Sequence, residues 1–308
     1  MASLSIAPLK PPPEGEPLGC SPSSTMDTLR PPKPAGATAC AASAHHAIRI
    51  APDGVLVSGS SALHEEGEVF VAHLGLGEVW GAPVASPTPL NVPGLRATAA
   101  AAGSLHSLLL DRDGAVWSCG AGWEGPLGHG DEATVPVPRR ISSLAVAVQS
   151  IAAGAAHSLA VCSGGQVHAW GWGRHGQLGH GGRSSVLSPR RVEAVSPPTR
   201  AIQAAAGCAH SLLLCSDGSV LQCGRAAACA AAGAKQDDDD DEEDEGEDEG
   251  EDERLARDVL TPRRVEVAPL RVVRLSASGD GSSAEGEGGR CFRWGVWREG
   301  EAGARGGR

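Results

Sequence analysis

The sequence predicts an all-β protein, a partial or open β-propeller of about five four-stranded blades, three of them well defined and two degenerate. Two observations predict this fold. A segment of about 50 residues recurs along the chain, and each copy divides into short apolar runs separated by Gly-rich turns. Four short strands in a repeat of this length are typical of a propeller blade, whereas a helical solenoid would need longer amphipathic runs than this chain contains.

The repeat is clearest in three segments that align without gaps. Each contains Gly-x-x-His-Ser, with the histidines at His106, His157 and His210, which are 51 and 53 residues apart. A turn glycine follows each His by eight residues, and another glycine comes six residues later. A weaker copy around His46 precedes these segments, and a degenerate copy ending in Trp294-Gly295, with no His at the expected place, follows them. Five related copies make chance similarity an unsatisfactory explanation.

Each copy divides into four expected strands. An Ala/Val-rich run leads to the first Gly, and an apolar run follows the His. A hairpin should come next, because glycine accepts positive φ at little cost. The fourth strand is expected in a Pro-Arg-Arg-aliphatic element at 138–141, 189–192 and 262–265, with a looser version at 89–92. The expected hairpin tips are Asp113-Gly114, Gly164-Gly165 and Asp217-Gly218.

Composition suggests how the chain is organised. Residues 1–38 are Pro-rich and predict a disordered extension, residues 39–297 hold the propeller repeats, and residues 298–308 form a Gly/Arg-rich tail. Residues 237–253 contain 15 acidic residues and two Gly, which predicts a disordered insertion at 235–255. A solvated loop is the simpler interpretation of this tract, and a contact for basic partners such as histone tails is the alternative.

The charge of the chain is concentrated in that tract. The formal net charge is −11, but removing those 15 from the 37 acidic residues leaves 22, against 26 basic ones. The expected folded part is therefore mildly basic, which does not predict sequence-specific nucleic-acid binding.

The nine cysteines lack CxxC or zinc-finger spacing, and Cys119 and Cys223 both stand directly before a Gly. They are better explained as small buried strand residues than as a disulfide framework, which predicts a cytoplasmic or nuclear protein. No apolar run is long enough for a membrane span, and the first residues do not resemble a secretory signal. Organelle targeting stays open.

One segment makes a family resemblance specific: Trp170-Gly-Trp-Gly-Arg-His-Gly-Gln-Leu-Gly-His-Gly181. Trp-Gly followed by Gly-Gln-Leu-Gly, with Gly-x-x-His-Ser upstream and Pro-x-x-Val downstream, resembles the regulator of chromosome condensation repeat. The resemblance covers roughly residues 38–297 and is closest over 97–224. That family's propeller usually has seven blades. Five copies therefore imply a truncated relative, an incomplete sequence, or an assembly that closes by oligomerising.

The resemblance implies an interaction propeller whose loop face binds other proteins and which has no catalytic site, metal or cofactor of its own. The alternative that it implies is a guanine-nucleotide exchange factor for a Ran-type small GTPase, which acts by inserting loops. A small GTPase and histones are the candidate partners, and no membrane partner is expected.

The repeated histidines could suggest a metal site. Ligands of one zinc ion must all lie about 2.0–2.1 Å from it, whereas equivalent atoms on successive blades are spread around the axis. We therefore expect each imidazole to be hydrogen-bonded to a neighbouring loop. A Ser directly follows each of these histidines, but adjacent strand residues point to opposite faces, so a Ser–His nucleophile pair is not expected. The glycines of Gly171-x-Gly-x-x-Gly176 match a dinucleotide fingerprint only formally, because no helix pattern follows them.

The candidate partner-binding residues lie in the Gly-rich loops. Trp172, Arg174 and His175 stand between glycines, and Trp123 lies in the preceding copy of the loop. Trp offers contact area, and Arg makes forked hydrogen bonds to carboxylates. Packing within the fold is the alternative for both loop tryptophans, and it is the expected role of Trp117, Trp170 and Trp294.

Overall fold

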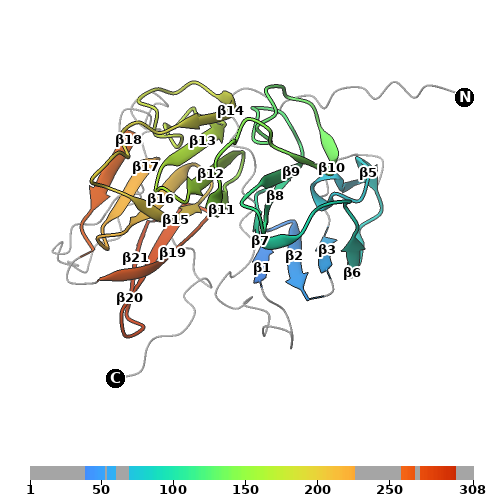
Figure 1. Ribbon diagram of the computed structural model, residues 1–308, viewed down its shortest axis with the longest axis horizontal. Helices are drawn as coiled ribbons and strands as arrows, with labels where there is room; N and C mark the ends of the chain where they lie inside the picture. The colour runs from blue at the N-terminus through green and yellow to red at the C-terminus, as the bar shows by residue number, and fades with distance from the viewer. Residues whose placement is uncertain (1–38, 53, 60–68, 226–257, 268–270, 296–308) are drawn as a thin grey trace, which may run out of the picture.

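The structure is a computed structural model that describes residues 39–52, 54–59, 69–225, 258–267 and 271–295. These residues form small antiparallel sheets that follow one another in chain order from β1 to β21 (Figure 1). Four sheets have four strands and a fifth has three, which confirms the predicted all-β propeller. The predicted disordered segments at 1–38, 235–255 and 298–308 lie outside the described residues.

Within each blade the strands follow the chain order across the sheet. Blade 1 contains β1 (Ala39–Ala42), β2 (His46–Ala51), β3 (Gly54–Gly59) and β6 (Val84–Leu90). Blade 2 contains β7 (Ala97–Ala102), β8 (His106–Asp111), β9 (Val116–Gly120) and β10 (Val135–Arg140). Blade 3 contains β11 (Val148–Ala153), β12 (His157–Cys162), β13 (Val167–Gly171) and β14 (Val186–Arg191).

Blade 4 contains β15 (Ala201–Ala206), β16 (His210–Cys215), β17 (Val220–Gly224) and β18 (Val259–Val265). Blade 5 contains β19 (Val272–Ser278), β20 (Gly281–Gly286) and β21 (Cys291–Gly295). The connection from β3 to β6 holds β4 (Val69–Phe70), the 3-10 turn η1 (Ala72–Leu74) and β5 (Trp80–Gly81).

The predicted hairpin tips join the second and third strands of blades 2 to 4. At each tip a turn glycine with φ between 77° and 81° donates its N–H to the last residue of the second strand. The register places each repeated His opposite the glycine that ends the third strand, as in the pair His157 and Gly171. In blade 5 the first position of the second strand is Gly281, where the degenerate copy lacks the His.

The hydrophobic core lies between the blades. Every residue of β8, β12 and β16 is buried, because alternate side chains pack against the blade on either side. Leu159 and Val161 of blade 3 pack with Leu213 of blade 4, while Ala160 packs with Leu108 of blade 2. Full burial of a leucine of this kind stabilises a fold by about 2 kcal/mol.

The first strands lie nearest the centre, because β7, β11 and β15 contact one another in succession. The fourth strands β6, β10, β14 and β18 therefore form the outer edges. Within the described part of the chain, β19–β21 do not pack against blade 1 in the way that neighbouring blades pack. The propeller formed by these residues is open at that point.

The acidic tract belongs to an enlarged loop of blade 4. Residues 225–258 connect β17 to β18, where residues 172–185 make the same connection in blade 3. Gly224 pairs with Val259 across the two strands, so the loop leaves and re-enters the sheet at neighbouring points. The insertion predicted at 235–255 falls within this connection, and residues 226–257 lie outside the described part.

The cysteines follow the prediction in part. Cys119, Cys162, Cys215 and Cys223 are buried and free, whereas Cys40 and Cys291 are free but exposed. Cys208 differs, because it is disulfide-bonded. In the described segments, no helix has the length and apolar character needed to span a bilayer.

Candidate functional site

The Gly-x-x-His-Ser motif forms a series of hydrogen bonds from blade to blade. His106 Nε2 lies 3.0 Å from Ser158 Oγ, and Ser158 Oγ donates to the carbonyl of Pro126 at 2.8 Å. Because the serine proton is used on that carbonyl, His106 Nε2–H is the donor to the serine. The same arrangement recurs as His46–Ser107–His73 O (2.7 and 2.6 Å), as His157–Ser211–Gln177 O (3.0 and 2.8 Å), and in part as His210–Ser282 (2.8 Å).

These bonds refine the expectation drawn from the sequence. The structural role of the histidines is confirmed, but each imidazole bonds to a serine of the next blade and reaches the loop only through that serine. Each His-Ser pair therefore bonds to both neighbouring blades. The Ser bonds to the His of the preceding blade, and the His bonds to the Ser of the following blade. Ser107, Ser158 and Ser211 are at most 1% exposed and donate to carbonyls, so they are not available as nucleophiles.

The glycine of the motif leaves room for the imidazole. A Cβ at Gly154 would overlap the ring of His157 and lie 2.5 Å from the carbonyl oxygen of Gly207 in the next blade. Gly103 and Gly207 have the same surroundings, with His106 and His210. In the weaker first copy, Ser43 stands in this place and its hydroxyl lies 3.0 Å from Nδ1 of His46.

Burial keeps these imidazoles neutral. Desolvation lowers the pKa of His106 and His210 to about 4 and the pKa of His157 to about 3, from an ordinary value of 6.5. It also lowers the pKa of His46 well below that value, and nearby histidines add to the effect. Neutral imidazoles fit donation from Nε2–H to serine.

The repeated histidines do not converge on a common point, since each is bonded to a different blade. Among the residues that the structure describes, no group of three or more His, Cys, Asp or Glu side chains is arranged to hold a metal ion.

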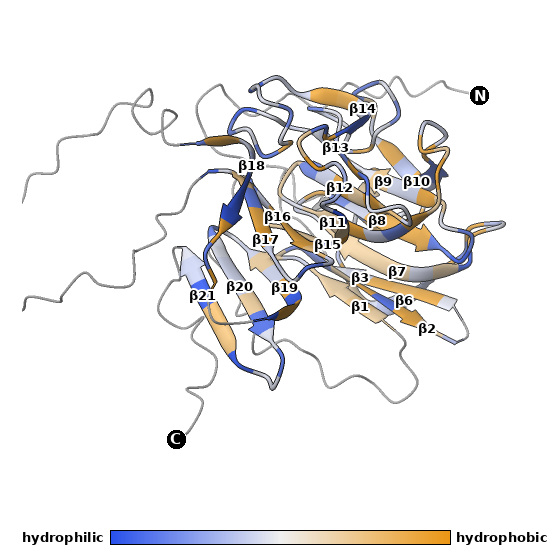
Figure 2. Ribbon diagram, turned by 60° about the vertical axis from the view of Figure 1, so that its left-hand side comes forward, coloured by the Kyte–Doolittle hydropathy of each residue, from blue (hydrophilic) through white to orange (hydrophobic). Residues whose placement is uncertain are grey.

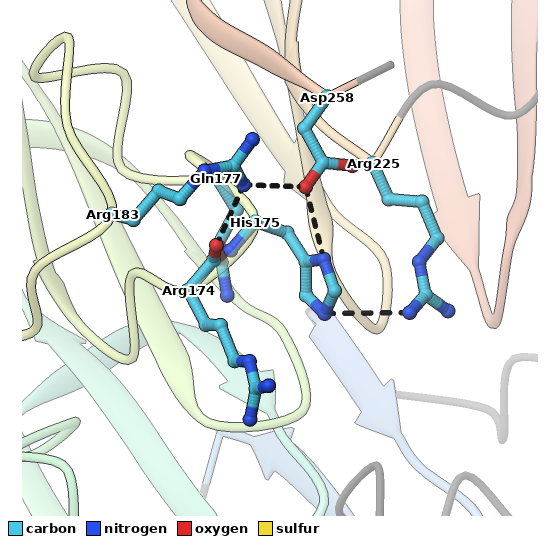
Figure 3. A network of polar contacts seen from close by, with 6 residues as sticks. All are labelled: Arg174, His175, Gln177, Arg183, Arg225 and Asp258. Atoms are coloured by element: carbon cyan, nitrogen blue, oxygen red, sulfur yellow. Dashed lines mark hydrogen bonds and ion pairs between the residues drawn. The ribbon is translucent and has the colours of Figure 1, made fainter. Parts of the chain in front are cut away.

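The loop from the third to the fourth strand of blade 3 carries three of the predicted site residues and is fixed by a second polar network (Figure 3). Nδ1 of His175 lies 3.1 Å from Oδ2 of Asp258, which directly precedes β18. Arg183 Nη1 donates to the same carboxylate oxygen at 2.7 Å and to the carbonyl of Arg174 at 2.8 Å. Arg225 Nη2 lies 3.3 Å from Nε2 of His175.

The partners determine the protonation of His175. Arginine can only donate, so Nε2 accepts from Arg225 and Nδ1–H donates to the carboxylate of Asp258. Burial lowers the pKa of His175, and Arg225 lowers it further, while the hydrogen bond to Asp258 acts in the opposite direction. Both nitrogens of this imidazole are therefore engaged in holding the loop to blade 4.

Trp172 and Arg174 lie on this fixed loop and are both partly exposed. The indole of Trp172 meets the ring of His175 edge to face, with centroids 5.2 Å apart, and its backbone N–H donates to the carbonyl of Ala156 at 2.9 Å. The guanidinium of Arg174 points away from Asp258 (Figure 3). The structure thus brings Trp172, Arg174 and His175 together in one loop.

Trp123 lies apart from them, in the equivalent loop of blade 2. It occupies the position that Arg174 holds in blade 3, and it is partly buried against Leu105 and Ala121. The strand tryptophans pack as expected: Trp170 is fully buried and donates to the carbonyl of Pro126 at 2.8 Å, and Trp294 donates to Oε1 of Gln222 at 2.8 Å.

Sequence reasoning missed Arg183, Arg225 and Asp258. Alignment of the loops themselves would have signalled Asp258, because Ser185 stands at the same place before β14. Ser185 Oγ donates to Oε2 of Glu124 at 2.5 Å, and Glu124 occupies the position of His175. The same link between loop and next blade therefore occurs twice with different residues.

The comparison with known proteins agrees with this geometry. The model of the regulator of chromosome condensation (RCC1) repeat matches residues 113–161 and 164–214, and a second model of this repeat matches residues 148–177. The chain therefore contains RCC1 repeats. The matched residues run from the third strand of blade 2, through blade 3, to the second strand of blade 4.

Similar RCC1-repeat proteins are larger than this chain. The Arabidopsis thaliana ultraviolet-B receptor UVR8 is 31% identical over 205 residues, which cover 66% of this chain and 42% of the receptor. The Mus musculus E3 ubiquitin-protein ligase HERC2 is 38% identical over 122 residues, which cover 39% of this chain and 2% of HERC2. The chain therefore spans well under two thirds of these relatives.

Solved structures support the fold. Human WBSCR16 has a TM-score of 0.65 at 20% identity, covering 84% of this chain and 62% of that one. Prp20p of Saccharomyces cerevisiae has a TM-score of 0.63 at 23% identity, covering 82% and 56%. At these identities the similarity concerns the fold alone.

Proposed function

We propose that this RCC1-repeat protein is a binding module that recognises another protein through the loop face of blades 3 and 4. The observation that carries the proposal is the fixed loop of blade 3, which holds a partly exposed Trp172 and Arg174 on the network of His175 and Asp258. Trp and Arg are enriched at protein interfaces, and a preordered loop loses little conformational entropy on binding.

Binding suits the chemistry of these residues better than catalysis. The carboxylate of Asp258 is 1% exposed and accepts from Arg183 and His175, and His175 uses both ring nitrogens within the fold. A general acid or base must reach the substrate with a free proton or lone pair. We therefore assign His175 to positioning Trp172, and Trp172 with Arg174 to the partner contact. Trp123 would contribute its exposed edge from blade 2.

Structures with the same fold agree with a protein partner. Prp20p was solved together with a study of its binding to Gsp1p and histones, and yeast RCC1 was solved bound to Kap60. Nucleotide exchange on a Ran-type GTPase is less favoured for this chain, which covers only 56% of Prp20p at 23% identity. A cytoplasmic or nuclear location goes with the proposal.

The test uses the full chain as bait. Partners captured by the wild-type protein are compared with those captured by Trp172→Ala/Arg174→Ala, which should capture at least about tenfold less while melting at nearly the same temperature. Arg112→Ala is the matched control, since Arg112 is exposed in the β8–β9 hairpin at the opposite end of the strands. Equal capture by the double variant would remove this loop from the proposal.

A second measurement separates binding from exchange. The chain, added in excess to a Ran-type GTPase loaded with fluorescent GDP, should leave the rate of GDP release unchanged. If the chain instead accelerates GDP release by orders of magnitude, it is an exchange factor and the binding-module proposal is wrong.

A further inference from the structure

The outer strands of three successive blades carry paired arginines at the same register. In blade 3, Arg190 lies opposite Ala169 and Arg191 opposite His168 on the third strand. The equivalent pairs are Arg139 and Arg140 on β10, opposite Ser118 and Trp117, and Arg263 and Arg264 on β18, opposite Gln222 and Leu221.

Packed residues fix the backbone on both sides of each pair. In blade 3, Pro189 comes before the arginines and packs against Gly128 of the preceding blade, and Val192 follows them with 2% exposure. Pro262 packs against Gly179 in the same way, and Pro138 against Gly75. The six arginines are exposed between these anchors, and Figure 2 shows the strongly hydrophilic stretch of β18 at the periphery of the fold.

These arginines differ from the other repeated residues of the blade. The motif glycines, histidines, serines and prolines all contact a neighbouring blade. The arginines share no such contact: Arg139 lies 3.8 Å from the exposed Asp131, and Arg191 lies 3.7 Å from the exposed Glu193, at positions that are not equivalent. Among the described residues, the other four make no ion pair or side-chain hydrogen bond.

We propose that the six arginines form an interaction surface for an acidic segment of a partner protein, a run of Asp and Glu residues. This inference rests on the proposed function, and it names the chemistry of a partner contact away from the loop of Trp172. The planar guanidinium forms forked hydrogen bonds with carboxylates, so paired arginines on a fixed strand match closely spaced carboxylates.

The arrangement favours a polypeptide over nucleic acid. The arginines stand on three separate blade edges, which a flexible chain can follow and a stiff duplex cannot. Asp131 and Glu193 lie among the arginines and divide the positive surface into short stretches, which suit a short run of carboxylates better than a continuous phosphodiester backbone. Arginine and proline also protect an edge strand from pairing with other chains, and this simpler role predicts no peptide binding.

The test is a fluorescence-anisotropy titration of a labelled 12-residue peptide of Asp and Glu, with the Asn/Gln peptide of the same length as control. The full chain should bind the acidic peptide saturably at low salt and lose about tenfold in affinity on going to about 0.2 M salt. The variant Arg140→Gln/Arg191→Gln/Arg264→Gln should bind at least about tenfold more weakly. Arg112→Gln/Arg200→Gln/Arg290→Gln, which makes the same charge change at exposed positions elsewhere, should bind within about twofold of wild type.

Equal losses in the two triple variants would overturn the assigned surface, and so would tighter binding of single- or double-stranded DNA than of the acidic peptide. A chain with the acidic residues of 237–253 changed to Asn and Gln is titrated in parallel. If this variant binds the peptide and the wild-type chain does not, the arginines are occupied by the protein's own acidic tract, and the partner assignment is overturned. Trp172→Ala/Arg174→Ala should keep wild-type peptide affinity, so failure of the loop proposal and failure of this one are distinguishable.

Discussion

Mild acid should destabilise this propeller through its His–Ser bonds. The pKa values of His106, His157 and His210 are lowered by burial to about 4, 3 and 4, whereas an unfolded chain would have values near 6.5. Below pH 6.5 these histidines are therefore protonated in the unfolded state but stay neutral in the folded state. The stability contribution is fully present above pH 6.5 and is lost as the pH falls towards the folded-state values.

The size of the effect follows from this difference. At pH 5.5 an imidazole that is protonated only when unfolded costs about 1 kcal/mol, so the three together lower the free energy of unfolding by roughly 3 to 4 kcal/mol. His46 and His73, whose pKa values are also lowered by burial, act in the same direction. Such a loss is a large part of the roughly 5–15 kcal/mol that is typical of folded domains.

Urea unfolding at pH 7.5 and pH 5.5, at constant ionic strength, measures this change above the range where carboxylates titrate. His210→Gln keeps a donor for Ser282 but no titratable group, and it should reduce the pH dependence by about 1 kcal/mol. His168→Gln, at a half-buried position, is the control and should reduce it less. Equal stability at the two pH values, or an unchanged slope in His210→Gln, would refute the assignment of the pH dependence to these histidines.

Three further changes test the contacts between blades. Gly154→Ala should cost about 3 kcal/mol, because the new methyl displaces His157 from Ser211, whereas Gly182→Ala, with open space at its Cβ, should stay within about 0.5 kcal/mol in a urea titration. Ser211→Ala should cost about 2 kcal/mol, because it leaves His157 Nε2 unpaired and the Gln177 carbonyl with only the weak thiol donor of Cys223. The exposed Ser216→Ala should melt as wild type. Deleting residues 237–253, which leaves every cysteine in place, should change the melting temperature by less than about 5 °C, since Gly224 already pairs with Val259. A larger fall would show that the tract supports the blade.

Much of the fold could be predicted because several copies of the repeat show the same strand pattern. The spacing of His157 from its turn glycine and from Gly171 defines a hairpin, and three copies give the same register. The partner of the imidazole could not be predicted in this way. Ser211 is 54 residues from His157, and no local periodicity shows that a side chain bonds to the next copy of the repeat. The network of His175 could not be predicted for the same reason, since its partner Asp258 lies beyond a long insertion in the sequence.

The position after each third strand combines a fixed backbone with a variable side chain. Ala121, Trp172 and Arg225 each follow the glycine that ends a third strand, and the N–H of each donates to a carbonyl at 2.8 to 2.9 Å. The backbone there is fixed in all three blades while the side chain differs, so this position can change without loss of the fold. Trp172→Ala gives blade 3 the residue that blade 2 already carries.

The substitution Trp172→Ala should therefore cost only about 1 kcal/mol, the scale of the lost edge-to-face contact with His175, and should leave the thermal melt cooperative. Partner capture should fall at least about tenfold, since a truncated aromatic anchor costs an interface more than about 1 kcal/mol. If the variant instead unfolds, the indole is needed for blade packing. If it folds and captures its partner normally, the contact lies elsewhere on the propeller, and the paired arginines of the outer strands become the first place to search.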